Sequence, residues 1–155
     1  MGRAWANRVD AWLQHEALPL WADAGLDLRY GGPHEALTLQ GEPAVSGFKR
    51  ARVTFRQLYV YSHAEILGWP GARAVADHLF AFAHDRFWQG PEGGWLRRVT
   101  PEGAPLDATP DLYDYAFAIF ALAWRYVATK DEAARRLAFA TLDIIETRFA
   151  HPGGE

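Results

Sequence analysis

Apolar residues recur along the chain in two patterns, and each pattern predicts a different kind of helix. In the first, residues such as Val75, Leu79 and Phe82 form one apolar stripe, which is typical of a helix with one face in water. In the second, as in LYDYAFAIFALAW, apolar side chains surround the helix and indicate burial on every side. Helices are predicted at Ala4–Ala17, Phe48–Leu67, Ala72–Phe87, Asp111–Ala128 and Glu132–Phe149, and the second and fourth are the all-round apolar ones.

Glycine pairs mark a repeat along this alternation of amphipathic and apolar helices. The pairs Gly31-Gly32, Gly93-Gly94 and Gly153-Gly154 follow one another at spacings of 62 and 60 residues. An Arg-Phe dipeptide precedes each of the last two pairs, so the repeat extends beyond the glycines. An outer amphipathic helix followed by an inner apolar helix, with a glycine loop at one end, is the pattern of a double-layered α/α barrel. We therefore predict an all-α fold in which any β structure is short and confined to the glycine loops.

Composition and charge narrow the possible partners and the cellular location. The 155 residues, half of them hydrophobic, suffice for one domain with its own core. A formal net charge of −3, with no basic run outside residues 49–52, argues against nucleic acid and anionic membranes as partners. The start of the chain lacks the apolar core of a signal peptide, and the longest apolar run, Tyr115–Trp124, is too short to span a bilayer. Because the chain also has no cysteine, we expect a cytoplasmic protein.

Four motifs appear in a characteristic order along the chain. They are the loop YGGPHEAL, the helix RQLYVYSHAEILGW, the segment GGWLRRVTPEGAPLDATPDLYDYAFAIFALAW and the closing HPGGE. Together they resemble the first half of the N-acylglucosamine 2-epimerase family, whose members are sugar 2-epimerases and aldose–ketose isomerases. The resemblance implies a partial (α/α)6 barrel, with residues 1–155 as a single domain that forms the N-terminal part. The helices of that domain would alternate as outer and inner hairpins.

Arg56 is the candidate catalytic residue, because it interrupts an otherwise apolar helix. The family's motif on this helix resembles Gln-Ala-Arg followed by aromatics, which places the pocket arginine at Arg56 in TFRQLYVYS. The resemblance implies that Arg56 binds a sugar oxygen and stabilises the enediolate formed when the C2 proton is removed. Such an anion needs a preorganised donor, and a guanidinium stays charged near neutral pH. The alternative is an arginine that merely lies on a helix surface.

The fourth predicted helix and the loop before it supply candidate substrate-binding residues. The family motif there resembles Leu-Tyr-Asp-His-Ala-Phe, but this chain has Tyr115 in place of the histidine, which leaves a hydroxyl and no group that titrates near neutrality. Asp111 lies one helical turn earlier on the same face and is a candidate acceptor for a sugar hydroxyl; the alternative is a helix N-terminal charge. Trp95 adjoins a glycine pair, where its ring can stack on a sugar or pack within the loop.

The histidines are further candidates for a chemical role. The six histidines include no i, i+4 pair and no metal-ligand cluster, so we expect no metal and no cofactor. His63 lies seven residues after Arg56 on the same helix and is a candidate to face the pocket; the alternative is a hydrogen-bonded core residue. A glycosidase would need two carboxylates across the pocket, and nothing in the sequence pairs Glu35, Asp111 and Asp114 in that way.

We predict interconversion at C2 of a free hexose through a cis-enediol, of the mannose–fructose isomerase or 2-epimerase type, with a small-molecule sugar as the partner. The family's two acid/base histidines fall in motifs beyond this chain, so the resemblance implies an incomplete and inactive fragment. The alternative is a non-enzymatic sugar-binding or helical interaction module. Because inner helices without neighbours expose apolar flanks, we expect residues 1–155 alone to form a homo-oligomer, aggregate or remain molten.

Overall fold

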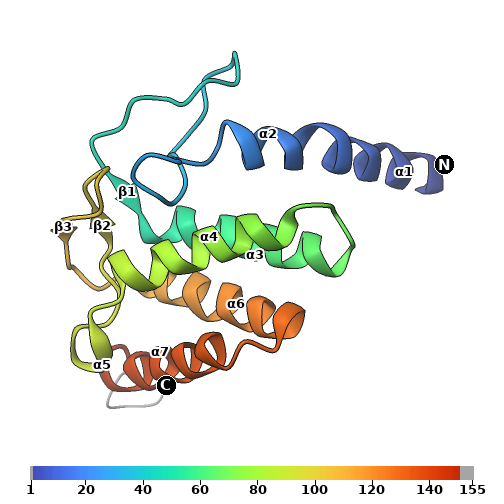
Figure 1. Ribbon diagram of the computed structural model, residues 1–155. Coiled ribbons are helices and arrows are strands. Elements are labelled where there is room, and N and C mark those ends of the chain that lie inside the picture. The colour runs from blue at the N-terminus through green and yellow to red at the C-terminus, as the bar shows by residue number, and fades with distance from the viewer. Residues whose placement is uncertain (1, 151–155) are drawn as a thin grey trace.

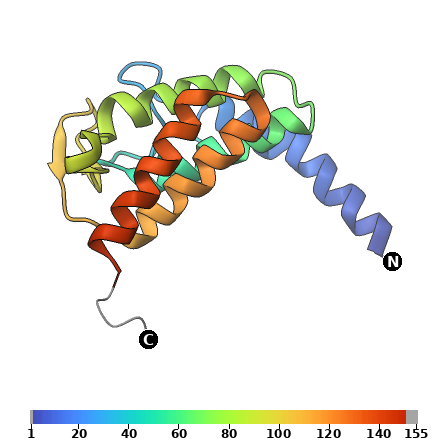
Figure 2. The same cartoon turned by 90° about the horizontal axis from the view of Figure 1, so that it is seen from below.

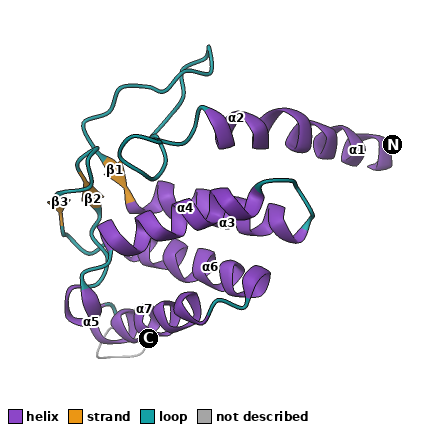
Figure 3. Cartoon of the chain, in the orientation of Figure 1, coloured by secondary structure: helices purple, strands orange, loops and turns teal. Residues whose placement is uncertain are grey.

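The computed structural model describes residues 2–150 and is predominantly helical (Figures 1 and 3). The helical segments are α1 (Gly2–Trp12), η1 (Leu13–Ala17), α2 (Leu18–Asp23), α3 (Ala51–Ile66), α4 (Ala72–Phe82), η2 (Ala83–Phe87), α5 (Gly90–Gly93), α6 (Leu112–Thr129) and α7 (Glu132–Arg148). The strands are β1 (Lys49–Arg50), β2 (Arg98–Val99) and β3 (Pro105–Asp107). The predicted all-α class and partial α/α barrel are confirmed. The predicted third glycine pair, Gly153-Gly154, and the motif HPGGE lie outside the described residues.

The two predicted apolar helices, α3 and α6, pack against each other at the centre of the molecule (Figures 1 and 2). Short turns join α3 to α4 and α6 to α7, so each central helix runs antiparallel to the helix that follows it. The pair α4 and α7 cover α3 and α6 from one side. This arrangement confirms the alternation of outer and inner helices that the apolar pattern predicts.

The core lies between these helices and is built from the stripes that the sequence pattern marks. Phe55 and Leu58 of α3, Leu79 of α4 and Leu122 of α6 are fully buried, and Ile144 of α7 is nearly so. Burying one such side chain contributes about 1.5–3 kcal/mol to folding. The predicted helix boundaries agree with α3, α6 and α7 within three residues, and α4 with η2 matches the predicted third helix.

The N-terminal helix differs from its prediction in length and in packing. It was expected to end at Ala17 but continues to Asp23, past Pro19. A proline inside a helix removes one backbone donor, and here the preceding turn widens: the N–H of Leu18 bonds to the carbonyl of Leu13, five residues back. The apolar side chains of α1 form one stripe, yet α1 has no buried residue. Among residues 2–150, no element covers that stripe.

The three strands form a small antiparallel sheet in the order β1-β2-β3, at one end of the helices (Figure 3). Strands β2 and β3 follow the second glycine pair, as expected, whereas β1 immediately precedes α3 and lies outside the glycine loops. Lys49 pairs with Val99, and Arg50 with Arg98. This pairing ties the start of α3 to the segment that leads into α6. The sheet therefore fixes the N-terminal ends of both central helices side by side.

Candidate functional site

The N-terminal halves of α3 and α6 present an exposed surface on which Arg56 is the central charge. The Arg56 guanidinium donates a hydrogen bond to the Tyr113 hydroxyl, and its carbon lies 4.6 Å from the centroid of the Phe117 ring. Both aromatic residues come from α6, four residues apart, so they share one face of that helix. Beside them, Ala116, Phe117 and Phe120 line a shallow hollow of about 340 Å³. The predicted catalytic residue is thus exposed and fixed by a neighbour from the other central helix.

An ion-pair network lies one turn before Arg56 and joins the starts of the two helices. Arg52 Nη2 is 2.6 Å from Asp111 Oδ2, and Arg52 Nε is 2.6 Å from Asp114 Oδ1. Arg97 immediately precedes β2, and its Nη2 lies 3.5 Å from the same Asp111 oxygen. Burial raises the pKa of the Asp114 carboxyl above its usual value, and the nearby Arg52 charge counters part of that rise. The network neutralises Arg52, which leaves Arg56 as the guanidinium without a carboxylate partner on this described surface.

Asp111 caps α6 in addition to its place in the network. Its Oδ1 accepts the backbone N–H of Tyr113 at 3.0 Å, which satisfies one of the free donors at the helix start. Its Oδ2 faces Arg52 and Arg97. The alternative that the sequence left open, a helix N-terminal charge, therefore describes its observed contacts. Asp111 lies beside the Arg56 surface, because it accepts the backbone N–H of Tyr113, whose hydroxyl accepts from Arg56.

Tyr115 and Trp95 lie in the core, on the opposite side of α6 from Arg56. The Tyr115 side chain is 1% exposed, and its hydroxyl accepts the backbone N–H of Trp95 at 3.0 Å. The Trp95 indole is 2% exposed, packs edge-on against Phe55 and donates to Thr141 Oγ1 at 2.8 Å. Tyr115, predicted as a candidate substrate-binding residue, therefore shares no exposed surface with Arg56, because its ring turns towards the glycine loop. For Trp95, loop packing describes the observed position.

His63 lies in an aromatic cluster towards the C-terminal end of α3. Its ring stacks on Tyr59 with centroids 5.8 Å apart and lies 4.4 Å from the Trp124 ring of α6. The Tyr59 hydroxyl is 3.5 Å from His63 Nδ1, and Phe120 contacts Tyr59 as well. The cluster continues the exposed face of Arg56 along both helices, so His63 and Arg56 share a surface and are separated by two helical turns.

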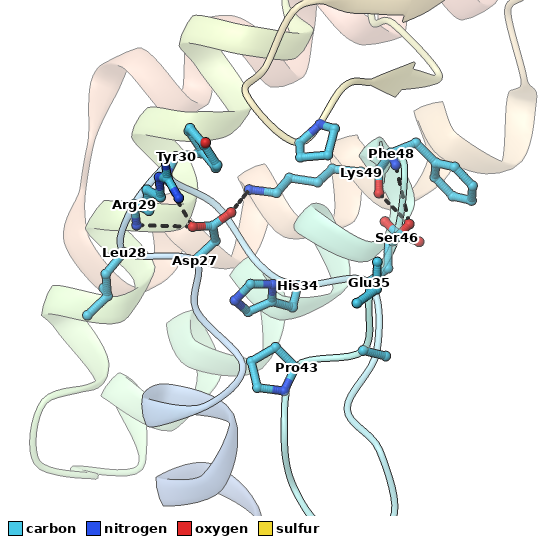
Figure 4. A pocket seen from close by; sticks show the side chains of 13 residues that line it. Asp27, Leu28, Arg29, Tyr30, His34, Glu35, Pro43, Ser46, Phe48 and Lys49 are labelled. Carbon is cyan, nitrogen blue, oxygen red and sulfur yellow. Dashed lines mark hydrogen bonds and ion pairs between the residues drawn. The ribbon is translucent and has the colours of Figure 1, made fainter.

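The long loop between α2 and β1 forms a separate hollow that the sequence did not reveal (Figure 4). The hollow encloses about 500 Å³, and its wall includes a buried ion pair in which Lys49 Nζ lies 2.7 Å from Asp27 Oδ2. Glu35, also in the wall, accepts the backbone N–H and the Nε of Arg50. Residues 22 apart in an irregular loop show no periodicity, so no pattern in the sequence marks this pair.

Across residues 2–150, no group of three or more His, Cys, Asp or Glu side chains is arranged to hold a metal ion. Within the same range, every helix is too short or too polar to cross a lipid bilayer.

Comparison with known proteins relates this fold to sugar-converting enzymes. The chain is 36% identical over 118 residues to a mannose-6-phosphate isomerase of Rhizobium meliloti, an alignment that covers 76% of this chain and 30% of the relative. It is 30% identical over 131 residues to a cellobiose 2-epimerase of Bacteroides fragilis, covering 84% of this chain and 33% of that enzyme.

The fold of this chain is also similar to the solved structures of sugar epimerases. The structure of a cellobiose 2-epimerase from Spirochaeta thermophila superposes with a TM-score of 0.87 at 29% identity, covering 94% of this chain and 36% of the other. The chain thus spans about a third of the length of the relatives it matches. The model of the family N-acylglucosamine 2-epimerase (GlcNAc 2-epimerase) matches residues 31–155. This chain belongs to the N-acylglucosamine 2-epimerase family.

Proposed function

We propose that this chain supplies the Arg56 surface of an enzyme that interconverts hexoses at C2, as an epimerase or a mannose–fructose type isomerase, through a cis-enediol. The observation that carries the proposal is the Arg56 guanidinium itself. It is exposed on a central helix, hydrogen-bonded to the Tyr113 hydroxyl, and has no carboxylate partner among residues 2–150. The relatives' names, an isomerase and two 2-epimerases, support the reaction class.

The chemistry explains why an unneutralised arginine matters. Removing the proton at C2 of an open-chain aldose places negative charge on the C1 oxygen, and transfer of the C2 hydroxyl proton to that oxygen moves the charge to the C2 oxygen. A guanidinium offers several fixed donors and a positive charge to those oxygens, and it gains most when the charge develops. Arg52 lies one turn away but is held by two carboxylates, so its charge is already matched. We assign the enediolate contact to Arg56 and the positioning of the α6 start to Arg52 and Asp111.

The neighbouring aromatic residues suit a sugar. Tyr113 and Phe117 flank the guanidinium, and sugar rings present C–H faces that pack on aromatic rings while their hydroxyls bond to polar groups. We propose that His63, with Tyr59 and Trp124, forms a further contact along the same face. In this proposal Tyr115 and Trp95 support the glycine loop from the core and do not touch the sugar.

The proton transfers require groups other than Arg56. A guanidinium stays protonated in proteins and cannot act as the general base. We propose that the acid and base come from polypeptide that completes this surface, and we expect residues 1–155 by themselves to show no turnover. The chain spans about a third of its relatives, so the activity is proposed for a complete barrel that contains this segment.

A chimera tests the function directly. Residues 2–150 would replace the matching segment of the Spirochaeta thermophila cellobiose 2-epimerase, where the alignment covers 36% of that chain. With sugar in D2O, the folded chimera should place deuterium at C2, and Arg56→Ala should lower that rate by about 10²-fold or more. Arg98→Ala, at a half-buried arginine of β2 paired with Asp107, is the control and should leave the rate nearly unchanged. A folded, active chimera that tolerates Arg56→Ala would contradict the assignment.

The second candidate is a non-enzymatic sugar-binding or helical interaction module, and one observation favours it. Apolar side chains on α1 and in the groove between α6 and α7 are exposed, as in a protein that associates with other polypeptides. A folded chimera that binds sugar but exchanges no C2 proton would favour this candidate.

We also propose a cytoplasmic location, supported by the absence of cysteine, which fractionation of cells expressing the tagged chain would test.

A further inference from the structure

The first glycine loop is bonded to helix α4 through a histidine side chain. The backbone N–H of Gly32 donates to His78 Nε2 at 3.0 Å, although the two residues are 46 positions apart in the sequence. A neutral imidazole carries its proton on one nitrogen and accepts with the other, so Nε2 is the unprotonated nitrogen in this contact. His78 is half-buried and takes no part in the proposed sugar chemistry. The contact exists only while the His78 ring is neutral.

Close packing of α4 against the loop brings this pair together. Phe82 lies one helical turn after His78, so both side chains belong to the same face of α4. Gly31 and Gly32 have φ of +86° and +71°, in the left-handed region that favours glycine. A Cβ on Gly32 would overlap the Phe82 ring. Because Gly32 has no side chain, the loop backbone approaches the helix closely enough for its N–H to reach the histidine.

The loop has a second tie, which joins it to β1. Lys49 Nζ donates to the Gly31 carbonyl. Within the loop, the N–H of Asp27 bonds to the Gly32 carbonyl at 2.9 Å and the N–H of Gly31 bonds to the Asp27 carbonyl at 2.8 Å, so the loop keeps its own shape. Only the tie to His78 uses a side chain that ordinarily changes charge between about pH 5 and pH 8.

The charged groups of the loop and of β1 already have partners. Lys49 and Asp27 pair with each other at 2.7 Å, and the Arg29 guanidinium lies over the neighbouring tyrosine ring. The Lys49 ammonium also lies 5.0 Å from the centroid of the Phe82 ring, close to the face of α4 that carries His78. A proton on His78 would thus place a second positive charge on this side of the loop.

The charged groups of the neighbouring helices are paired as well. Asp77 precedes His78 on α4, and its carboxylate binds the Arg125 guanidinium of α6. Arg73, one turn before Asp77, pairs with Glu65 of α3 at 2.5 Å. Among residues 2–150, no carboxylate forms an ion pair with the His78 ring. A protonated His78 would therefore lose its role as an acceptor and gain no counterion.

We propose that His78 is a pH-sensitive switch for the first glycine loop: the neutral ring ties Gly32 to α4, and a protonated ring releases it. Protonation turns Nε2 from an acceptor into a donor, so two N–H groups would face each other. The bond is complete at neutral pH and is lost as the pH falls through the range in which histidine gains its charge. The loop stays tied to β1 through Lys49, so only its α4 side opens.

Release of the loop from α4 would act on the hollow beside it. Residues 27–30 form part of the wall of this hollow of about 500 Å³ (Figure 4). They belong to the same turn as Gly32, so the wall loses its polar tie to α4 when His78 is protonated. The shape of the hollow therefore depends on pH, whichever reaction the complete protein performs.

Amide hydrogen exchange, measured by NMR on the unchanged chain, tests the switch. After correction for intrinsic exchange, protection of the Gly32 amide should fall about tenfold or more between pH 7.5 and pH 5. The Tyr30 amide, which donates to the Asp27 carboxylate, should keep its protection over the same range. The midpoint of the Gly32 change should coincide with the titration of the His78 ring, followed through the ¹⁵N shift of Nε2.

Two variants separate the acceptor from the charge. His78→Gln offers an amide oxygen near the position of Nε2 and cannot gain a proton in this range, so Gly32 should stay protected at both pH values. His78→Leu removes the acceptor, and Gly32 should be unprotected at both. The control is His15→Gln, at an exposed position of η1, which should behave as the unchanged chain.

Three results would overturn the proposal. They are a Gly32 amide that is unprotected at pH 7.5, one that keeps its protection at pH 5, and a loss of protection whose midpoint differs from that of the His78 ring. An acid loss that persists in His78→Gln would overturn it as well. The coincidence of the two midpoints in the unchanged chain decides the case if a variant fails to fold.

Discussion

Lys49 and Asp27 form an ion pair that is buried beneath the first glycine loop, with Lys49 Nζ 2.7 Å from Asp27 Oδ2 (Figure 4). Only 3% of Lys49 and 7% of Asp27 are exposed. The ammonium also donates to the Gly31 carbonyl, and the other Asp27 oxygen accepts the backbone N–H groups of Arg29 and Tyr30. The Asp27 carboxylate thus orders the glycine loop through the two N–H groups and neutralises the buried Lys49 ammonium at the start of β1. Replacing it with a neutral amide leaves the Lys49 charge buried without its counterion, while one amide oxygen can still accept the two N–H groups.

The substitution Asp27→Asn should therefore cost about 3–5 kcal/mol of unfolding free energy, the usual effect of breaking one side of a buried pair. Urea denaturation followed by circular dichroism measures the change. The control is Glu132→Gln, which breaks an exposed pair with Arg135 and should cost less than about 1 kcal/mol. Equal effects of the two substitutions would mean that the Asp27 pair is exposed to water in solution.

The same carboxylate predicts how stability depends on pH. Burial alone raises the pKa of Asp27, but the Lys49 and backbone hydrogen bonds and the Lys49 charge outweigh it and hold the pKa below the usual 3.8. Between the two pKa values the unfolded chain binds more protons, so stability falls as the pH drops. The contribution is complete above about pH 4–5 and is lost as the pH falls through the lowered pKa. Denaturation measured from pH 6 to pH 2.5 should show a shallower acid loss for Asp27→Asn.

The sequence predicts the helices well because their stripes repeat over many residues. The α3 and α6 helices were recognised as central from apolar residues on all sides, and both lie at the centre of the structure. Arg56 was expected to open onto the pocket, because a charge in such a helix is costly to bury without a partner, and the structure gives it an exposed position on α3. These predictions rest on local periodicity and on the cost of burying charge, which the sequence carries directly.

The direction of single side chains on those helices was less predictable. An all-round apolar helix has no polar stripe to distinguish its faces, so a tyrosine such as Tyr115 fits either the core or the exposed surface. In the structure Tyr115 lies in the core, where the backbone N–H of Trp95 provides a hydrogen-bond partner for the tyrosine hydroxyl. The Lys49–Asp27 pair was missed because it depends on the path of a long irregular loop. Such contacts follow from tertiary packing and leave no periodic trace.

Tyr115→Phe should destabilise the protein by about 1–3 kcal/mol, because the buried Trp95 N–H loses its acceptor. Thermal melting with near-UV circular dichroism would report both stability and the environment of the tryptophan. The matched control is Tyr126→Phe on the same helix, whose hydroxyl makes no hydrogen bond within residues 2–150 and should change stability by less than about 0.5 kcal/mol. A neutral Tyr115→Phe would indicate that water replaces the hydroxyl.

Gly94→Ala tests how closely the glycine loop approaches the same tyrosine. Gly94 has φ +73°, and an added Cβ would overlap the Tyr115 hydroxyl. Gly68 has a similar φ of +80° with no atom near an added Cβ, so Gly68→Ala measures backbone strain alone, about 1–2 kcal/mol. Gly94→Ala should cost about 1–3 kcal/mol more than this control because the overlap adds to the strain.

The double variant Gly94→Ala/Tyr115→Phe identifies the group that causes the overlap. Removing the hydroxyl relieves its part of the contact, although the Tyr115 ring carbon Cζ would still lie 3.2 Å from the new Cβ. The double variant should therefore cost less than the sum of the two single variants, with a coupling of about 0.5–3 kcal/mol in chemical denaturation. Additive costs would show that the loop moves away from Tyr115 when Gly94 is replaced, and the close packing of loop against helix would then not hold in solution.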